Sequence, residues 1–467
     1  MLTRLEVDGF KNLDGFIADF GPFTCIAGEN GVGKSNIFDA IEFMALIASG
    51  GLMEAARQVR STRDDSAGEP EHLFTNGNAS RMPMRFCAEM IVPPQVEDDF
   101  GVAVAPSTTF LRYEVVIGIH SPRGGQRQGR LVVESESLVH ITRANSIKHL
   151  GFPHKKEFRN EVVLGKRQGG PFISTLAEEN KITVHQDGGS RGPPKRALPT
   201  GAATTVVSTI NSADDPTILA VRREMQTWRR LALEPTALRA ADRFVDPDSL
   251  TSDGHHLAAT LHRIAMTPDV TGMVDPTGVY ARVAGRLAGL SGLDARAVRV
   301  DQDETRQLLT LLVTDRNGLD LPARSLSEGT LRYLALCVLL EDPTVTGLIC
   351  MEEPENGIHP GNLAEMVNLV QDLAIDPSLP PGFDNPLRQV IVNTHSPSVV
   401  QLIDTNDLVL ASEDRPGVSG RQRALRIDGM VGSWRDHRNG RPGALKVSLL
   451  DYLTPPPGAQ LRLVAAG

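Results

Sequence analysis

Apolar and polar positions alternate over residues 2–7, which is the pattern of an edge strand. Residues 15–20 repeat that alternation and predict the second strand of a hairpin. Residues 23–27 form a short apolar run that ends in a glycine-rich turn. Between residues 35 and 47 the apolar positions take the spacing of a helix. The predicted order is therefore two hairpin strands, a third strand, a glycine-rich loop and a helix.

The hydrophobic pattern after residue 60 predicts an antiparallel sheet, irregular segments, and then an alternation of helices and strands. Strands are predicted at residues 84–92, 109–119 and 130–141, as an antiparallel sheet. Residues 61–80 and 143–205 are rich in glycine and polar residues and are interpreted as loops. Helical patterns follow at residues 215–233, 255–265 and 279–290. Further on, strands are predicted at residues 297–301, 308–315, 348–351 and 389–393, and helices from residues 327 and 360.

The glycine-rich loop has the sequence Gly28-Glu29-Asn30-Gly31-Val32-Gly33-Lys34-Ser35, which fits the phosphate-loop pattern G-x-x-x-x-G-K-[ST]. Glycine tolerates positive φ, so successive N–H groups can turn inward around an anion. The following helix adds the positive end of its dipole. Lys34 is expected to reach the β- and γ-phosphates of ATP, and the Ser35 hydroxyl to ligate Mg²⁺.

Two carboxylates, Glu352 and Glu353, end the buried strand at residues 348–351. Adjacent strand residues point to opposite sides, so the two acids are expected to do different jobs. Glu352 is placed to hold the Mg²⁺ shell, and Glu353 to orient or deprotonate the attacking water. A solvated acidic turn is the alternative reading of the pair alone.

Two weaker signals accompany these. Ser327 and Gly329 begin an apolar helix as a Ser-x-Gly cap, whose amides can bind a phosphate. His395 follows the strand at residues 389–393 and can hydrogen-bond a γ-phosphate. Each has a plain alternative, a helix cap for the first and a surface histidine for the second.

The four motifs in this order resemble the ATPase head of ABC-type proteins, in the branch of the structural-maintenance-of-chromosomes (SMC) proteins, RecF and the OLD nucleases. Phe10-Lys11-Asn12, Glu-Glu-Pro-Glu and Thr-His-Ser-Pro narrow the resemblance to compact predicted ATPases of that branch. The resemblance implies an α/β P-loop NTPase fold in which ATP and Mg²⁺ lie between two heads. It implies nucleotide contacts for a set of residues from both halves of the chain: Lys11, Asn12, Asn30, Gly31, Gly33, Lys34, Ser35, Asn36, Ser327 and Gly329.

In that arrangement Ser327 and Gly329 contact the γ-phosphate bound to a partner chain. Asn356 lies at the seam between the heads, and His395 senses the γ-phosphate. Glu352 replaces the aspartate that is usual in transporter relatives. The segments implied are residues 1–142 as the first part of the head with a side sheet, 143–295 as an inserted lobe, 296–412 as the second part of the head, and 413–467 as a basic tail.

The composition restricts the partners. The chain of 467 residues has a net charge of −9 and only 4% aromatic residues, so a base-stacking platform is not expected. Residues 143–196 hold 11 Lys and Arg against 5 Asp and Glu, and residues 415–446 hold 8 against 2. Each segment therefore has a net charge of +6, and the rest of the chain has a net charge of −21. These segments could hold phosphate backbones, or could be solvated loops.

The expected activity is ATP hydrolysis coupled to pairing of heads, in DNA repair or in defence with a separate effector. The candidate partners are a second copy of the chain in a homodimer or higher oligomer, DNA, and a separate nuclease or toxin effector. Two alternatives stay open: a nucleotide switch that holds a protein effector without touching DNA, and a transporter ATPase. The four cysteines are expected to be reduced core thiols, and the compartment to be the cytoplasm without a membrane span. Neither a long coiled coil nor a TOPRIM nuclease domain is indicated.

Overall fold

The computed structural model describes residues 1–59, 70–75, 82–120, 129–165, 169–187, 195–269, 271–290, 295–413, 424–440 and 442–453. The chain divides into two compact units, and each is described by itself. The first unit contains Met1–Arg229, Pro377–Pro380 and Asp404–Gly467, and the second contains Arg230–Asp376 and Pro381–Ile403. The four functional segments expected above follow the motifs rather than this division, and they stay predictions.

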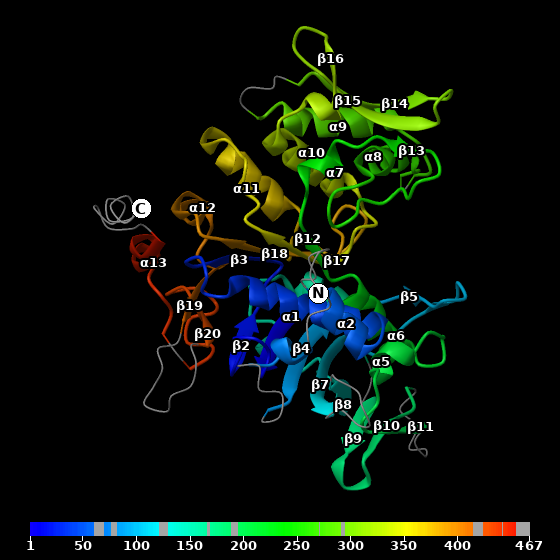
Figure 1. Ribbon diagram of the computed structural model, residues 1–467, viewed down its shortest axis with the longest axis vertical. Coiled ribbons are helices and arrows are strands. Elements are labelled where there is room, and N and C mark those ends of the chain that lie inside the picture. The colour runs from blue at the N-terminus through cyan, green and yellow to red at the C-terminus, as the bar shows by residue number, and fades with distance from the viewer. Residues whose placement is uncertain are drawn as a thin grey trace. The chain divides into compact units, whose positions relative to one another are not determined.

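An eight-stranded antiparallel sheet forms much of the first unit, in the order β11-β10-β9-β8-β7-β4-β1-β2 (Figure 1). The predicted strands near the start and in the side sheet are confirmed within one or two residues. The strands are β1 (Leu2–Asp8), β2 (Phe16–Asp19), β4 (Met84–Ile91), β7 (Phe110–His120), β8 (Arg130–His140), β9 (Ile173–Leu176), β10 (Lys181–Val184) and β11 (Arg196–Pro199).

Side-chain alternation explains why this sheet forms. Along β7, Leu111, Tyr113, Val115 and Ile117 are buried on one face. The opposite face carries a ladder of ion pairs across neighbouring strands, such as Arg112 on β7 with Glu89 on β4 at 2.9 Å. One face of an antiparallel sheet thus packs on the core while the other remains polar.

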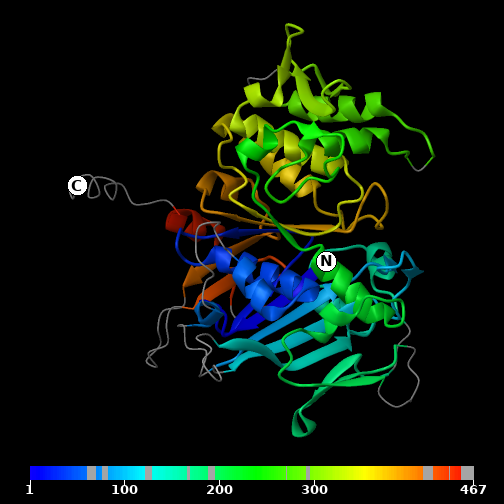
Figure 2. The ribbon, with the colours of Figure 1, turned by 45° about the vertical axis from the view of Figure 1, so that its right-hand side comes forward.

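Helices α1 (Lys34–Ser49), α2 (Leu52–Gln58) and α6 (Pro216–Gln226) lie side by side against this sheet (Figures 1 and 2). Strand β3 (Phe23–Ala27) is buried throughout, which explains its unbroken apolar run. It pairs in parallel with β19 (Leu408–Glu413), which pairs antiparallel with β20 (Leu425–Gly429). The remaining elements of the unit are α3 (Ser146–His149), α4 (Lys156–Val162), α5 (Val206–Thr209), α13 (Lys446–Leu453) and the hairpin β5 (Val96–Glu97) and β6 (Ala103–Val104).

Two predictions about elements were wrong. Residues 143–205 are not simply irregular, because they contain β9, β10 and β11 and three short helices. Each of these strands has only four residues, which is too short to give a clear alternating pattern. The helix predicted over residues 215–233 stops at Gln226, and strand β12 (Arg229–Leu231) follows it.

The second unit contains a parallel pair of strands, β17 (Gly347–Glu352) and β18 (Arg388–Thr394), with β12 beside β17. Nearly every residue of β17 and β18 is buried, as expected for strands covered on both faces. A small antiparallel sheet of β13 (Asp242–Arg243), β14 (Ala297–Asp303), β15 (Leu308–Thr314) and β16 (Asp320–Pro322) belongs to the same unit. The helices of the unit are α7 (Pro235–Leu238), α8 (Leu257–Met266), α9 (Pro276–Leu287), α10 (Glu328–Glu341), α11 (Leu363–Asp372) and α12 (Pro397–Leu402).

The helix predicted from residue 327 is α10, and Ser327 caps it by accepting a hydrogen bond from the N–H of Thr330. The four cysteines are buried and free of disulfides, as predicted. Across the part of the chain that the structure describes, no helix combines the length and apolar character needed to cross a membrane.

Candidate functional site

The phosphate loop joins β3 to α1 in the first unit. Its backbone has the conformation expected of an anion nest, with φ of 83° at Gly31 and 99° at Gly33. A Cβ at Gly33 would lie 2.2 Å from Nδ2 of Asn12, whereas a Cβ at Gly31 would meet nothing within 4 Å. Gly33 is therefore required by both conformation and space, and Gly31 by conformation alone.

Lys34 lies inside this loop and is only 6% exposed. Its ammonium donates to the carbonyl oxygens of Gly28 at 2.6 Å and Glu29 at 2.8 Å. A buried cation held by the loop's own carbonyls is positioned to move to phosphate oxygens, which are stronger acceptors for an ammonium. Ser35 and Asn36 follow on the first turn of α1 and are half-buried.

The Phe10-Lys11-Asn12 segment holds the phosphate loop from the side. Nδ2 of Asn12 donates to the carbonyl of Val32 at 3.1 Å, and Oδ1 of Asn12 accepts from Nδ2 of Asn36 at 2.7 Å. Lys11 forms an ion pair with Asp39 of α1 at 2.7 Å. The side chain of Phe10 is fully buried. The segment therefore supports the loop, and Asn12 contacts it on both sides of Lys34.

Aromatic packing anchors that segment to the sheet. The ring of Phe10 lies 5.8 Å from that of Phe43 on α1 and 5.3 Å from that of Phe86 on β4. Such pairs add about 0.5–1.5 kcal/mol each beyond their buried area. The phosphate loop and the large sheet are thus coupled through one rigid aromatic cluster.

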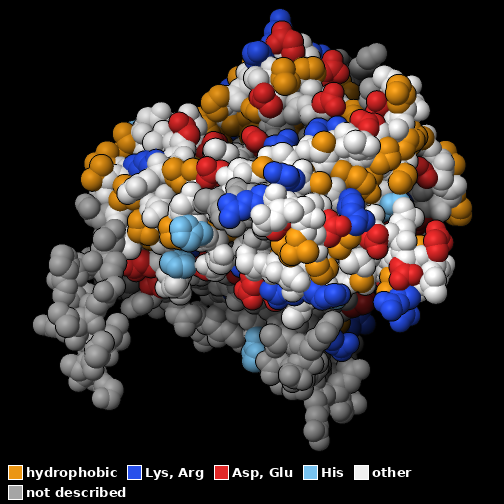
Figure 3. All heavy atoms as spheres, turned by 90° about the horizontal axis from the view of Figure 1, so that it is seen from above, with side chains coloured by type: hydrophobic (Ala, Val, Ile, Leu, Met, Phe, Trp, Pro, Cys, Tyr) orange, Lys and Arg blue, Asp and Glu red, His pale blue; other side chains and the backbone are white. Residues whose placement is uncertain are grey.

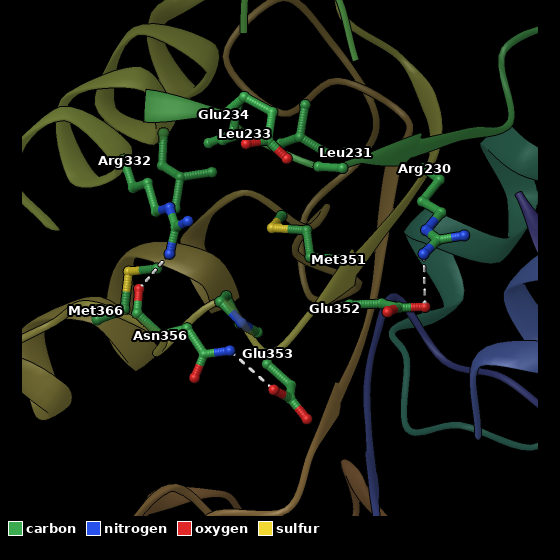
Figure 4. A pocket seen from close by; sticks show the side chains of 13 residues that line it. Arg230, Leu231, Leu233, Glu234, Arg332, Met351, Glu352, Glu353, Asn356 and Met366 are labelled. Atoms are coloured by element: carbon green, nitrogen blue, oxygen red, sulfur yellow. Dashed lines mark hydrogen bonds and ion pairs between the residues drawn. The ribbon is translucent and has the colours of Figure 1, made fainter. Parts of the chain in front are cut away.

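In the second unit, Glu353 and His395 follow neighbouring parallel strands. Nδ1 of His395 lies 2.7 Å from Oε1 of Glu353. Nδ2 of Asn356 donates to Oε2 of Glu353 at 2.8 Å (Figure 4). The N–H of Glu353 donates to both the backbone and the side-chain oxygen of Asn393, each at 3.1 Å. Both carboxylate oxygens of Glu353 are therefore held in place.

Glu353 leaves the strand with φ of 46°, in the left-handed region. This conformation is uncommon for a residue other than glycine and costs about 1 kcal/mol or more. The prediction assumed that Glu352 and Glu353 are successive strand residues whose side chains point to opposite faces of the sheet. Strand β17 ends at Glu352, so that alternation does not extend to Glu353. The two carboxylates still point apart, but the backbone turn rather than the strand pleat separates them.

Glu352 points toward Arg230, whose Nη2 lies 3.1 Å from Oε1 of the carboxylate (Figure 4). A cavity of about 210 Å³ lies beside this pair. Arg332 on α10 borders the same cavity and donates to the backbone oxygen of Asn356 at 2.6 Å. Arg230 was not singled out from the sequence, and it changes the setting of the predicted metal ligand.

The Ser327-x-Gly329 cap opens onto a separate cavity of about 270 Å³, also bordered by Gly357 and His359. A Cβ at Gly329 would lie 2.3 Å from the carbonyl oxygen of Gly357. Glycine is therefore required where α10 approaches the loop after β17. The cavity gives a ligand or partner access to the amide end of α10.

The basic segments differ in how their charges are used. Arg435 is 6% exposed and donates to the carbonyl of Asp19 at 2.9 Å, and burial lowers its pKa to about 9. Arg438 donates to the carbonyl of His149 at 2.8 Å. By contrast, Lys148, Lys155 and Lys156 are exposed. On the described part of the face shown in Figure 3, basic and acidic side chains are interspersed.

Two family models match the chain. Residues 182–401 match one described as "AAA domain, putative AbiEii toxin, Type IV TA system", and residues 4–80 match one described as "AAA domain". These ranges contain the phosphate loop, the Ser-x-Gly cap, the acidic strand end and His395. Both matched models describe AAA domains, so the chain is similar to AAA-domain proteins over residues 4–80 and 182–401.

Individual relatives are distant or partial. A stretch of 50 residues is 50% identical to Structural maintenance of chromosomes protein 1 of Schizosaccharomyces pombe, which is 10% of this chain and only 4% of that protein's length. Among solved structures, the chain is similar to an SMC head bound to the C-winged helix domain of ScpA, at 12% identity over 92% of this chain and 97% of that one, with a TM-score of 0.44. The SMC head of Thermotoga maritima is matched at 12% identity over 92% and 98%, with a TM-score of 0.34.

The structure groups the predicted site residues unit by unit. Within the first unit, Lys11, Asn12, Lys34 and Asn36 gather around the phosphate loop. Within the second unit, His395 and Asn356 both contact Glu353. Glu352 is the last residue of β17, and Ser327 caps α10. Their roles toward nucleotide stay predictions.

Several residues with contacts in these sites carried no predicted role, among them Asp39, Arg230, Arg332, Glu355, Asn393 and Thr394. Glu355 belongs to the Glu-Glu-Pro-Glu motif and Thr394 to the Thr-His-Ser-Pro motif, but neither residue was assigned a role from the sequence alone. Their presence in motifs was a signal that could have pointed to them. Arg230 lies outside every motif, so the sequence offered no signal for it.

Proposed function

We propose that this chain hydrolyses ATP, with Glu353 as the residue that orients or deprotonates the attacking water. The observation that carries the proposal is the Glu353 carboxylate held between His395 and Asn356. A carboxylate fixed at both oxygens after a buried strand is suited to accept a water proton. His395 is positioned to stabilise the charge that develops near it.

The phosphate loop has the groups needed to bind the phosphates of a nucleoside triphosphate. Positive φ at Gly31 and Gly33 lets the N–H groups of the loop turn inward, where they can donate to phosphate oxygens. The buried Lys34 ammonium is a further donor. Mg²⁺, when bound, would neutralise charge on the β- and γ-phosphates, with Ser35 and Glu352 as its ligands from this chain. The ion pair between Glu352 and Arg230 must open or rearrange for that role.

We propose further that two heads pair, with the Ser327–Gly329 cap of one acting on nucleotide bound by the other. The cap's amide end faces a cavity of about 270 Å³ rather than a packed core. A helix N-terminus with free space in front of it is suited to an anion. A two-fold dimer would then contain two equivalent composite sites.

For the cellular role we propose DNA repair or defence with a separate effector. The matched family description that mentions a putative toxin supports an effector partner. Exposed Lys148, Lys155 and Lys156 offer a surface for phosphate backbones. A second candidate, a nucleotide switch that holds a protein effector without DNA, is favoured by the burial of Arg435 in the other basic segment.

The first test is Glu353→Gln. We expect nucleotide affinity within about twofold of wild type and turnover reduced by about a hundredfold or more, because an amide cannot accept the water's proton. The variant should also accumulate a dimer in ATP, measured by light scattering. Unchanged turnover would remove Glu353 from the mechanism.

The second test mixes two inactive variants, Ser327→Arg and Lys34→Ala. In a mixed dimer one composite site carries both lesions and the other carries neither, so activity should return to part of the wild-type level. Each variant alone serves as the control. If mixed dimers form, as shown by differential tagging, and the mixture stays inactive, the pairing in trans is wrong.

The third test separates the two cellular roles. Changing Lys148, Lys155 and Lys156 together to Glu should weaken DNA binding and reduce its dependence on salt. Arg57 and Arg306 are exposed and lie outside both basic segments, so changing them to Glu is the control. DNA binding that is absent in wild type would favour the switch without DNA contact.

A further inference from the structure

A second link joins the loops that follow β17 and β18. The hydroxyl of Thr394 donates to Oε1 of Glu355, and the same hydroxyl accepts the N–H of Ser396 at 2.9 Å. Thr394 is fully buried. One hydroxyl therefore connects Glu355 to the backbone on the far side of His395.

This link lies directly beside the contact between Glu353 and His395. The three successive residues Asn393, Thr394 and His395 each contact the loop after β17: Asn393 receives the N–H of Glu353, Thr394 contacts Glu355, and His395 contacts the Glu353 carboxylate. Because Thr394 is bonded to the loop on one side and to Ser396 on the other, it restricts the backbone rotation that aims the imidazole.

Glu355 is an unusual residue to find in this position. Its second oxygen, Oε2, is buried, and no hydrogen-bond partner for it exists among the described residues. Burial raises the pKa of Glu355 above its ordinary value, and the neighbouring Glu353 carboxylate adds to that rise. Leaving a buried polar atom unsatisfied costs about 1–3 kcal/mol. A neutral, smaller or apolar side chain would avoid that cost.

We propose that Glu355 is a positioning residue for ATP hydrolysis, which acts through Thr394 to keep the His395 imidazole aimed at Glu353. The inference rests on the proposed role of Glu353 as the group that acts on water. In this proposal Glu355 acts through Thr394 and not by contact with the substrate. Its function is to keep His395 in one orientation during turnover.

Two pairs of variants test the link. Glu355→Ala and Thr394→Val remove it, whereas Glu355→Gln keeps an acceptor at Oε1 and Thr394→Ser keeps the hydroxyl. We expect the first pair to lower kcat about tenfold, with KM and the affinity for a fluorescent ATP analogue within about twofold. The second pair should keep kcat within about threefold of wild type. Equal losses in both pairs would overturn the proposal.

A double-mutant cycle with His395→Ala separates positioning from general structural damage. If Glu355 acts through His395, Glu355→Ala should have little further effect on kcat in the His395→Ala background. Multiplied losses would show that Glu355 acts independently of His395 and would overturn the proposal. Should Glu355→Ala fail to fold, the same cycle can be run with Thr394→Val.

The orientation of His395 can also be followed without turnover. In protein with ¹³C-labelled histidine, the His395 resonance is assigned by its loss in His395→Ala. It should shift or broaden in Glu355→Ala and stay near its wild-type position in Glu355→Gln. An unchanged resonance in Glu355→Ala would contradict the positioning role. A different result would separate the two proposals. If Glu353→Gln has normal turnover but the His395 resonance is shifted in Glu355→Ala, Glu353 is not the base, whereas Glu355 still positions His395.

Discussion

The phosphate-loop site and the strand-end site hold their functional groups by different means. In the first unit, the loop's shape comes from the backbone, with two glycines at positive φ and Asn12 bonded to Val32 and Asn36. In the second unit, Glu353 is held mainly by side chains, from Asn393, His395 and Asn356. One site depends on a local run of residues, and the other on partners about 40 residues apart in sequence.

This difference indicates how each site should respond to change. A backbone site tolerates few substitutions within its loop, since the geometry is set by which residues can adopt it. A side-chain site can be altered one contact at a time, and each change should give a graded loss. The comparison therefore predicts steep effects in the phosphate loop. At the strand ends it predicts smaller, separable effects for the side chains around Glu353, though not for Glu353 itself.

The steepest effect is expected for Lys34→Ala. Removing the buried ammonium deletes the cation that faces the β- and γ-phosphates, so ATP affinity or turnover should fall by about a hundredfold or more. Equilibrium binding of a fluorescent ATP analogue measures this directly. Lys148→Ala, at an exposed lysine of the same unit, is the control. Wild-type affinity in Lys34→Ala would refute the nucleotide site.

A smaller effect should distinguish the two loop glycines. Both have positive φ, but only a side chain at Gly33 would collide with Asn12. We expect Gly33→Ala to weaken nucleotide binding about tenfold or more and Gly31→Ala about fivefold, since strain at a positive φ alone costs about 1 kcal/mol. Adding Asn12→Ala to Gly33→Ala should recover part of the loss. Equal effects at both glycines would show that steric contact with Asn12 is unimportant.

The sequence allowed the phosphate loop to be predicted because the pattern and its function are both local. Strand β3, the glycines, Lys34 and α1 follow one another within 30 residues, and the spacing alone restricts the structure. The large sheet was also predictable where strands were long, as at β4, β7 and β8. The short strands β9, β10 and β11 were missed because four residues do not define a period.

The strand-end site was only partly predictable. Glu352, Glu353 and His395 stood at the ends of apolar runs, so their clustering followed from the rule for parallel strands. The left-handed turn at Glu353, the Glu355–Thr394 link and the Arg230–Glu352 pair depend on contacts between distant segments. The charge pattern of residues 415–446 likewise did not reveal that Arg435 is buried.

A graded effect at the strand ends is expected for Arg230→Gln. The ion pair with Glu352 is about a quarter exposed, and a pair of this kind contributes about 0.7 kcal/mol. If Glu352 must leave Arg230 to help bind Mg²⁺, removing Arg230 should lower the half-saturating Mg²⁺ concentration by about threefold. Titration of nucleotide binding with Mg²⁺ measures this shift, and Arg332→Gln on the opposite wall of the cavity is the control. A higher Mg²⁺ requirement would indicate that Arg230 instead holds Glu352 in its binding position.

The smallest effect on turnover is expected for a buried carboxylate remote from the proposed chemistry. Glu136 on β8 is fully buried and accepts the N–H groups of Val206 at 2.6 Å and Val207 at 3.1 Å. Burial nevertheless raises its pKa to about 7 from the ordinary value of 4.5. Unlike Glu355, it has hydrogen bonds at both oxygens.

The sign of its effect on stability follows from the direction of that shift. Between pH 4.5 and 7 the unfolded chain loses the proton of Glu136 while the folded chain keeps it, so the contribution of Glu136 to stability declines as pH rises through this window. Glu136→Gln cannot titrate and should flatten the pH dependence of the unfolding free energy by about 1–3 kcal/mol. Denaturant unfolding at several pH values measures the difference from wild type, and turnover should stay within about twofold. If Glu136→Gln lost as much turnover as Glu355→Ala, both carboxylates would act on turnover through the stability of the fold. Glu355 would then have no specific positioning role that distinguishes it from other core residues.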